Sequence, residues 1–217
     1  MPYQIIDPDR WSRAEYLKFF KGMSHPWYNI CTHLDVTVLY QHCKANKQRF
    51  FHAYLYLMQQ AINQCKPMRY RLVNDSVHLY EKLNISIAIL ADDDSIRFCN
   101  LPYEPQFTSF SHAATSAEIE IKQTPFILTQ FIGQEMRHDT IHMTVLPWLN
   151  FTSMSHARDT KNPDSIPKIA LGKLTHINGH WQIPLSIEVH HGMMDGLHVG
   201  KFIAILQALF NQPELLN

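Results

Sequence analysis

The chain has 217 residues, 46% of them hydrophobic, which is enough for one sizeable core and allows one or two domains. Nineteen basic and nineteen acidic side chains cancel, so nothing points to nucleic acid or to an anionic membrane surface. No window approaches the roughly 20 apolar residues of a membrane span, residues 1–13 lack a signal-peptide pattern, and the cysteines lack Cys-x-x-Cys spacing. We therefore expect a cytoplasmic protein with reduced cysteines and with no nucleic-acid or membrane partner.

The first third of the chain carries alternating helix and strand signals. Asp7-Pro8 is a helix-start signal, and aromatic residues up to Phe20 then recur at helical spacing. The pattern next predicts a strand over Tyr28–Val36, followed by a short helix that ends near Lys47. A longer helix is predicted over Phe50–Gln64, because its apolar residues form one broad stripe.

The middle of the chain is rich in strand signals. Two hairpins are predicted, the first from Tyr70–Val73 and Val77–Tyr80, the second from Asn84–Leu90 and Ile96–Leu101. The second turn contains three consecutive aspartates, residues 92–94, which we interpret as a solvated turn rather than a cation site. Residues 108–135 have a helical pattern that breaks at Pro125.

The last third combines strands with a final helix. The predicted segments are a strand over Met143–Phe151, a polar loop over Met154–Pro167, a hairpin of Ile169–Thr175 and Trp181–Val189 across Asn178-Gly179, and a helix over Val199–Phe210. Together the elements predict a single α/β domain over residues 1–217. We expect a two-layer α+β arrangement with helices packed on a mixed sheet.

The stretch His190–His198 carries the clearest chemical signal. Two histidines end an apolar run, and Asp195 follows His191 by four residues, so an imidazole and a carboxylate could form a general base. Two other interpretations stay open, namely ordinary strand-end histidines and a metal site of His191, Asp195 and His198. Consecutive histidines on a strand point to opposite faces, so few ligands would converge and no metal is expected.

The spacing His-His-x-x-x-Asp-Gly resembles the active-site motif of CoA-dependent acyltransferases, and more closely that of the chloramphenicol acetyltransferase family. Three further segments resemble that family: Trp11-Ser12-Arg13-Ala14-Glu15-Tyr16, the run Thr144–Phe151 containing Leu146-Pro147-Trp148, and the run Pro184–Val189 that leads into the histidines. The chain length matches as well. The resemblance therefore extends over almost the whole sequence.

The resemblance implies an acetyl-CoA-dependent O-acetyltransferase that acetylates a hydroxyl of chloramphenicol or a similar small molecule. His191 would be the general base in a ternary complex, and Asp195 would form an ion pair with Arg13. Thr144 stands where the family has a serine that donates to the oxyanion, although threonine is also a good strand residue. The family further implies a homotrimer with its active sites at the subunit interfaces.

The resemblance also assigns binding residues, with several departures. Trp148 and Lys173 would lie near the coenzyme, although Leu174 replaces a tyrosine there and Trp148 could equally be a core residue. The acceptor side would use Phe20, Tyr28, Ile87, Ile96 and Ala170, and several of these are apolar where the family has hydroxyl groups. Transfer chemistry is therefore better supported than chloramphenicol as the acceptor.

Two alternatives from other classes remain. An acyltransferase core of the 2-oxo-acid dehydrogenase type is less favoured, because no lipoyl domain or Ala/Pro-rich linker precedes the core. A catalytically degenerate trimer that only binds a ligand would explain the departures at Thr144, Phe20 and Ala170. The presence of the base together with its supporting ion pair argues against that alternative.

Overall fold

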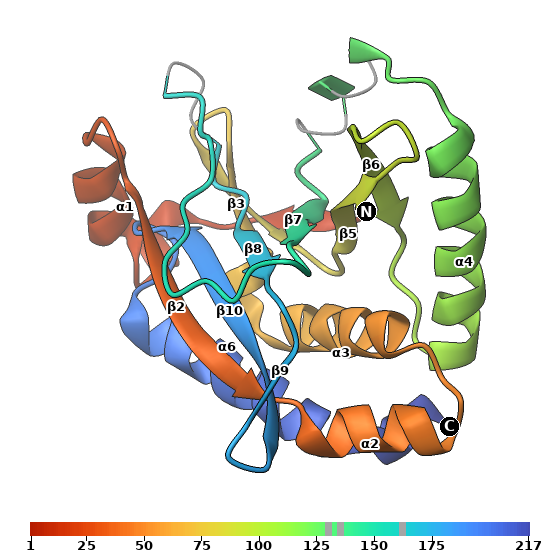
Figure 1. Ribbon diagram of the computed structural model, residues 1–217. Coiled ribbons are helices and arrows are strands. Elements are labelled where there is room, and N and C mark those ends of the chain that lie inside the picture. The colour runs from red at the N-terminus through yellow and green to blue at the C-terminus, as the bar shows by residue number, and fades with distance from the viewer. Residues whose placement is uncertain (129–131, 134–136, 161–163) are drawn as a thin grey trace.

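A computed structural model describes residues 1–128, 132–133, 137–160 and 164–217. It confirms a two-layer arrangement in which helices cover one face of a mixed sheet (Figure 1). The larger sheet has the strand order β2-β10-β8-β7-β5-β6, and β9 pairs with β10. Its strands are β2 (Trp27–Asp35), β5 (Asn84–Leu90), β6 (Ile96–Leu101), β7 (Thr140–Val145), β8 (Lys168–Leu171), β9 (Thr175–Ile177) and β10 (His180–His190).

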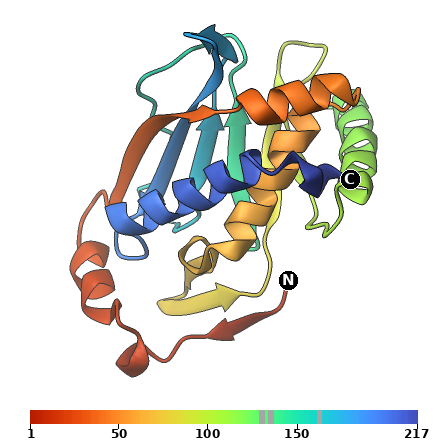
Figure 2. The same ribbon diagram turned by 90° about the horizontal axis from the view of Figure 1, so that it is seen from below.

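Of the helices in the described residues, three form the second layer and two others lie at its margins. The helices are α1 (Ala14–Lys21), α2 (Thr37–Ala45), α3 (Phe50–Gln64), α4 (Phe107–Gln123) and α6 (Gly196–Phe210). Figure 2 shows α6 (blue) and α3 (orange) crossing in front of the strands, with α2 beside them. No helix in these described ranges has the length and apolar character needed to cross a bilayer.

The helix α6 shows why the second layer forms. Val199, Phe202, Leu206 and Phe210 recur at helical spacing, and all four are buried against the sheet and α3. Each such side chain contributes about 1.5–3 kcal/mol when it is fully buried. The amphipathic stripe in the sequence is thus the face that joins the two layers.

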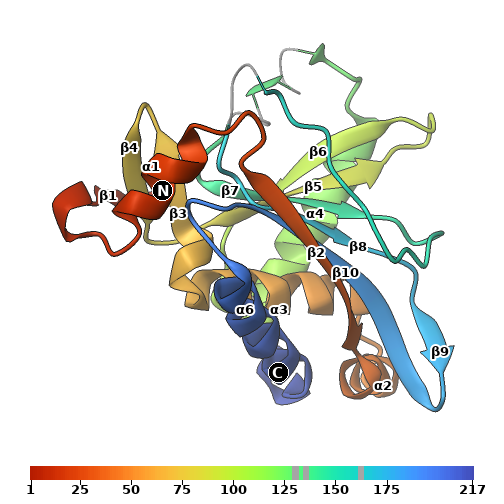
Figure 3. The same ribbon diagram turned by 90° about the vertical axis from the view of Figure 1, so that its left-hand side faces the viewer.

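A small second sheet lies at one end of the molecule, beside α1 (Figure 3). It has the order β1-β4-β3, from β1 (Tyr3–Ile5), β4 (Ser76–Tyr80) and β3 (Tyr70–Val73). The strand β1 was not predicted, because a run of three residues is too short to show a strand period in the sequence. Its pairing with β4 across more than seventy residues of sequence defines it as a strand.

The structure confirms two predicted hairpin turns in which both central residues have positive φ. Asn74 and Asp75 have φ of 46° and 67°, and Asn178 and Gly179 have φ of 51° and 85°. Positive φ at both central residues is the requirement of the type I′ turn.

Three predicted boundaries were wrong. The strand predicted to reach Phe151 ends at Val145, because the following Pro147 has no N–H to continue a ladder. The helix predicted to reach residue 135 ends as α4 at Gln123, ahead of Pro125, and residues 129–131 and 134–136 lie outside the described residues. The strand predicted over Ile169–Thr175 is divided into β8 and β9 by a turn at Gly172.

The two faces of the large sheet differ in character. Val145, Leu171 and Leu185 lie side by side on neighbouring strands, and the last two belong to the core beneath the helices. Side chains alternate along a strand, so the adjacent row Thr144, Ala170 and Ser186 lies on the opposite face. This face, which no helix of the described residues covers and which we call the helix-free face, therefore carries the polar positions of the central strands.

Candidate active site

The turn after β10 holds His191 in a defined position. The His191 N–H donates to the Pro26 carbonyl at 2.8 Å, and the His190 carbonyl accepts from the N–H groups of Met193 and Met194 at 2.9 and 3.1 Å. The Gly192 N–H donates to Nδ1 of His190 at 3.1 Å. Hydrogen bonds on both sides of His191 thus fix the backbone of the turn, and with it the position from which the His191 side chain extends.

Two aromatic rings border the His191 imidazole. Phe20 stacks on it with centroids 4.0 Å apart and 6° between planes, and Tyr28 packs at 4.6 Å and 41°. Burial, followed by the nearby Asp195 charge, raises the pKa of Tyr28 to about 12, so its hydroxyl is neutral at physiological pH. Within the described part of the chain, neither that hydroxyl nor Nδ1 of His191 has a hydrogen-bond partner. The imidazole is therefore oriented by rings and still able to exchange a proton.

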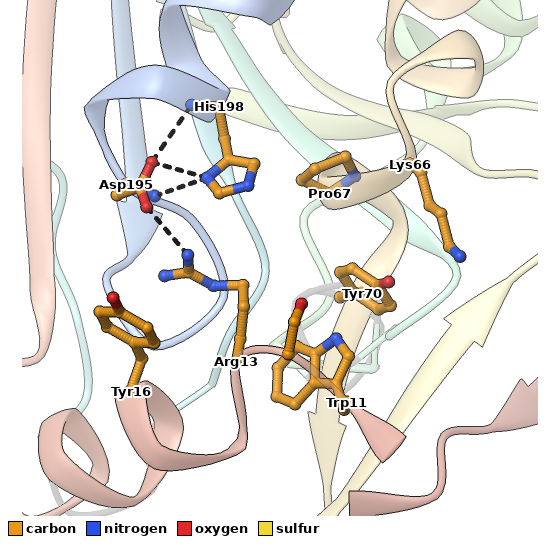
Figure 4. A pocket seen from close by; sticks show the side chains of 9 residues that line it. Trp11, Arg13, Tyr16, Lys66, Pro67, Tyr70, Asp195 and His198 are labelled. Carbon is orange, nitrogen blue, oxygen red and sulfur yellow. Dashed lines mark hydrogen bonds and ion pairs between the residues drawn. The ribbon is translucent and has the colours of Figure 1, made fainter.

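Arg13 fixes the same turn from α1 (Figure 4). Its Nη1 donates to Oδ2 of Asp195 at 2.9 Å, its Nη2 to the His191 carbonyl at 2.9 Å, and its Nε to the Gly192 carbonyl at 3.2 Å. The guanidinium is almost completely buried, with 9% of the side chain exposed. A single rigid fork therefore joins three points of the turn that carries His191.

Asp195 also caps α6. Its Oδ1 accepts from the N–H groups of Leu197 and His198 at 3.1 and 3.3 Å and lies 2.7 Å from Nδ1 of His198. Partial burial alone would raise the pKa of Asp195, but hydrogen bonds from Arg13 and His198 outweigh it and lower that pKa to about 2. Figure 4 shows Asp195 between Arg13 and His198 at the wall of a cavity of about 230 Å³. The carboxylate is thus charged and fully occupied in holding the turn and the helix.

This lowered pKa makes a prediction about acid stability. The stabilisation from charged Asp195 is present above its unfolded pKa of about 3.9 and is lost as the pH falls toward about 2. Asp195→Asn should therefore unfold at a lower temperature than the unmodified protein at neutral pH, and this difference should shrink as the pH falls through that window. Thermal unfolding at several pH values measures it. Asp75→Asn, which removes an exposed partner of Lys21, is the matched control. An Asp195→Asn difference that is equally large in acid would contradict the assignment.

Thr144 and Ala170 form a second group that lies apart from His191. Thr144 of β7 is opposite Ala170 of β8, which is opposite Ser186 of β10. His191 follows Ser186 by five positions, which is roughly 16 Å along a strand, and the two strand steps add about 10 Å sideways. Thr144 and His191 of one chain therefore cannot contact the same small acceptor group.

Trp148 and Lys173 lie together beyond the ends of β7 and β8. The Lys173 N–H donates to the Leu149 carbonyl at 2.8 Å, which ties the two turns together. A side chain at Gly172 would meet that carbonyl at 2.5 Å and Pro184 at 2.4 Å, so this close approach requires glycine. Trp148 is 62% exposed and Lys173 is exposed, so neither is a core residue.

An apolar cavity of about 350 Å³ opens beside these turns. Trp148, Val145 and Leu174 line it from the sheet side, and Phe50, Phe51 and Tyr54 line it from the start of α3. These three aromatic residues of α3 were not predicted as site residues. They lie within a broad apolar stripe, and no spacing signal distinguishes the residues of such a stripe that line a cavity from those in the core.

Two predicted acceptor residues lie outside both groups. Ile87 is fully buried in the core and lies opposite Met143, on the side of the sheet that the helices cover. Ile96 is 46% exposed at the start of β6, the edge strand farthest from β10. The structure thus brings Phe20 and Tyr28 to His191, and Ala170 to Thr144, but leaves Ile87 and Ile96 away from both.

Among residues 1–128, 132–133, 137–160 and 164–217, no group of three or more His, Cys, Asp or Glu side chains could hold a metal ion. Of the three residues considered as metal ligands, His191, Asp195 and His198, Nδ1 of His198 lies against Asp195, whereas His191 is enclosed by aromatic rings. The arrangement instead matches acid–base chemistry, in which an oriented imidazole moves a proton.

Comparison with known proteins places this site in a family. Residues 1–207 match the family model described as chloramphenicol acetyltransferase. The chain belongs to the chloramphenicol acetyltransferase family. It is 24% identical to chloramphenicol acetyltransferase 3 of Escherichia coli over 97% of this chain and 98% of that protein. It is 27% identical to the chloramphenicol acetyltransferase of Bacillus pumilus over 99% and 97% of the two chains. The family membership makes this chain an acyltransferase.

The solved structures agree with this family. A chloramphenicol acetyltransferase covers 96% of this chain and all of its own, with a TM-score of 0.86 and 25% identity. A probable dihydrolipoamide acetyltransferase from Listeria monocytogenes covers 98% and 94% of the two chains, with a TM-score of 0.68 and 16% identity. The second likeness shows a shared fold, which is the fold expected for CoA-dependent acyltransferases.

Proposed function

We propose that the protein is an acetyl-CoA-dependent O-acetyltransferase in which His191 is the general base. The observation that carries this proposal is the clamped turn, where Arg13 and Asp195 hold the backbone on either side of an imidazole enclosed by Phe20 and Tyr28. Such rigid placement is what a base needs, because proton transfer requires hydrogen-bond reach to the acceptor hydroxyl.

The proposed reaction has two stages. The His191 imidazole takes the proton of the acceptor hydroxyl, and the oxygen attacks the thioester carbonyl to form a tetrahedral oxyanion. The Thr144 hydroxyl donates a hydrogen bond to that oxyanion. The carbon–sulfur bond then breaks, and the released thiolate takes the proton from the imidazolium. The products are the acetyl ester and free CoA, with the base returned to its neutral form.

The separation of Thr144 from His191 leads to the proposed assembly. Since the two residues of one chain are too far apart to share an acceptor, the site needs His191 from one subunit and Thr144 from another. A homotrimer, the assembly that the sequence resemblance implies, would bring the turn of one subunit against the helix-free face of its neighbour. Cyclic symmetry would repeat this interface between each pair of neighbouring subunits, so every active site of the trimer would have the same composition.

The coenzyme is proposed to lie at the turns that carry Trp148 and Lys173. The exposed indole offers a stacking surface, and the exposed lysine offers a positive charge for a phosphate. Trp148 follows Thr144 by four residues, just past the end of β7, so a coenzyme held there would have its thioester near the oxyanion donor.

The acceptor is proposed to be chloramphenicol or a similar hydroxylated small molecule with apolar surface. Phe20 and Tyr28 provide aromatic walls. The Tyr28 hydroxyl, which has no hydrogen-bond partner among the described residues, supplies a hydrogen bond to the acceptor. Because Phe20 and Ala170 lack hydroxyl groups, acceptors that depend on hydrogen bonds at those positions should react less well.

Release of free thiol from acetyl-CoA tests the function directly. With chloramphenicol and a panel of hydroxylated acceptors, we expect saturable thiol release that requires an acceptor and gives a stoichiometric ester by mass spectrometry. The panel should include dihydrolipoamide as a thiol acceptor, because the dehydrogenase cores share the fold, and its acetyl thioester should be followed by mass spectrometry since transfer to a thiol leaves the number of free thiols unchanged. Thiol release at the same rate without any acceptor, or no release with the whole panel, would refute the proposed activity.

A further inference from the structure

A buried ion-pair network lies beneath the turn that carries His191. Glu188 precedes His190 by two residues on β10, and Arg158 comes from the loop between β7 and β8. Nε of Arg158 donates to Oε1 of Glu188 at 2.7 Å, and its Nη1 donates to Oδ1 of Asp164 at 2.8 Å. The side chains of Arg158 and Glu188 are 2% and 5% exposed. Removing one of these charges would therefore leave the other buried without its counter-charge.

The network extends to His190 through Trp27. The Trp27 indole N–H donates to the Asp164 carbonyl at 3.0 Å, and the Arg158 guanidinium lies 5.2 Å from the centre of the Trp27 ring. Trp27 is opposite His190 across β2 and β10, and the two rings meet edge to face at 6.0 Å. Arg158 therefore acts on His190 both through its charge and through the ring that packs against it.

His190 can brace the turn only while it is neutral. Its Nδ1 accepts the Gly192 N–H at 3.1 Å, and a protonated imidazole would present an N–H there and could accept nothing. Burial, and after it the Arg158 charge, lowers the pKa of His190 to about 4. The charged or titratable groups that act on this ring are Arg158, Asp164 and His191, and the neighbouring Glu188 is paired with Arg158, approached by His156 and opposite the buried Lys168.

We propose that Arg158 is a positioning residue for acetyl transfer, because it neutralises Glu188 and Asp164 and so keeps His190 as the hydrogen-bond acceptor that holds the His191 turn. This inference rests on the proposed function of His191. It assigns a role in this reaction to a loop residue more than thirty positions from the base in sequence, and it explains why a carboxylate is buried two residues before His190.

Replacing Arg158 with methionine should change the pH dependence of the reaction. The substitution leaves Glu188 and Asp164 without their shared cation, and both carboxylates then favour protonated His190. On the acidic side of the profile, which we call the acid limb, kcat falls as the pH is lowered. We expect the pH at which kcat is halved there to rise by at least about one unit, the size of shift that loss of a neighbouring charge causes. The KM for acetyl-CoA should change little, because the contacts of Arg158 described above are with Glu188, Asp164 and Trp27 and not with the proposed coenzyme residues.

Two further variants separate positioning from general destabilisation. Glu188→Gln removes an anion while Arg158 keeps its bonds to Asp164 and the Ile166 carbonyl, so the acid limb should stay where it is in the unmodified protein. Arg137→Met, which breaks the more exposed pair with Asp139, is the matched control and should leave the profile unchanged. An unshifted limb in Arg158→Met, or equal shifts in all three variants, would overturn the proposal.

Nitrogen-15 NMR of the histidine rings tests the same inference without any substrate. In the unmodified protein His190 should remain a neutral imidazole with an acceptor Nδ1 across pH 5–8, and in Arg158→Met it should titrate within that range. Unchanged His190 signals in folded Arg158→Met would overturn the positioning role. If the acyl-transfer assay fails but His190 titrates as expected, the proposed function is at fault and the network is not.

Discussion

Replacement of His191 by alanine is expected to reduce acetyl transfer by about 10²–10⁴-fold with every accepted alcohol, the typical contribution of a positioned general base. The physical reason is that an alcohol is a weak nucleophile at neutral pH unless its proton is removed as the new bond forms. The fold should survive, because the backbone of the turn is held by Pro26 and Arg13 rather than by the imidazole. Initial rates at saturating acetyl-CoA measure the effect.

The control for this experiment is His112→Ala, which truncates an exposed histidine on α4. Its rate and molecular mass in solution should equal those of the unmodified protein. Turnover that persists in His191→Ala, while its mass and unfolding temperature are unchanged, would show that another group takes the proton.

Replacement of Thr144 by valine is expected to lower kcat by about 10²–10³-fold, equivalent to the 2.7–4 kcal/mol that loss of an oxyanion donor costs in related sites. Valine has nearly the shape of threonine, so the change removes the hydroxyl and little else. Thr144→Ser keeps the donor and should retain or raise activity, because serine lacks the methyl group that restricts the rotamer. Equal rates for the serine and valine variants would reject the role.

The proposed interface allows these two variants to be combined. Each mixed trimer of His191→Ala and Thr144→Val subunits contains one interface in which both functional side chains are intact, roughly a third of its sites. Co-expression of the two variants, followed by purification through different affinity tags, should therefore restore activity that neither variant has alone. Mixed trimers without activity would place both residues in the same subunit's site or outside the site.

The fold was largely predictable because its elements carry strong local signals. The stripe of α3, the stripe of α6 and the two turns at Asn74-Asp75 and Asn178-Gly179 are properties of neighbouring residues, and each appears where the sequence indicates. The order of strands in the sheet was not predictable in this way. It depends on pairings such as β10 with β2 and β8, which join segments far apart in the chain.

The candidate site was likewise predictable only where its residues are close together in the sequence. His191, Asp195 and Gly196 stand close together in a motif, so the sequence alone indicates a base with a nearby carboxylate. Arg158 and the aromatic residues of α3 carry no such signal, because a charged loop residue and an apolar helix stripe are common in any chain. Their contacts with Glu188 and with the cavity exist only after distant segments pack together.

By itself, the sequence determined the class of chemistry and the elements that carry it, since motif spacing and hydrophobic periodicity are local. Only the tertiary structure decided that Arg13 holds three points of the His191 turn and that an ion-pair network lies beneath His190. It also decided that His191 and Thr144 of one chain lie apart. These features depend on strand register and burial, which arise from contacts between residues that are remote in sequence.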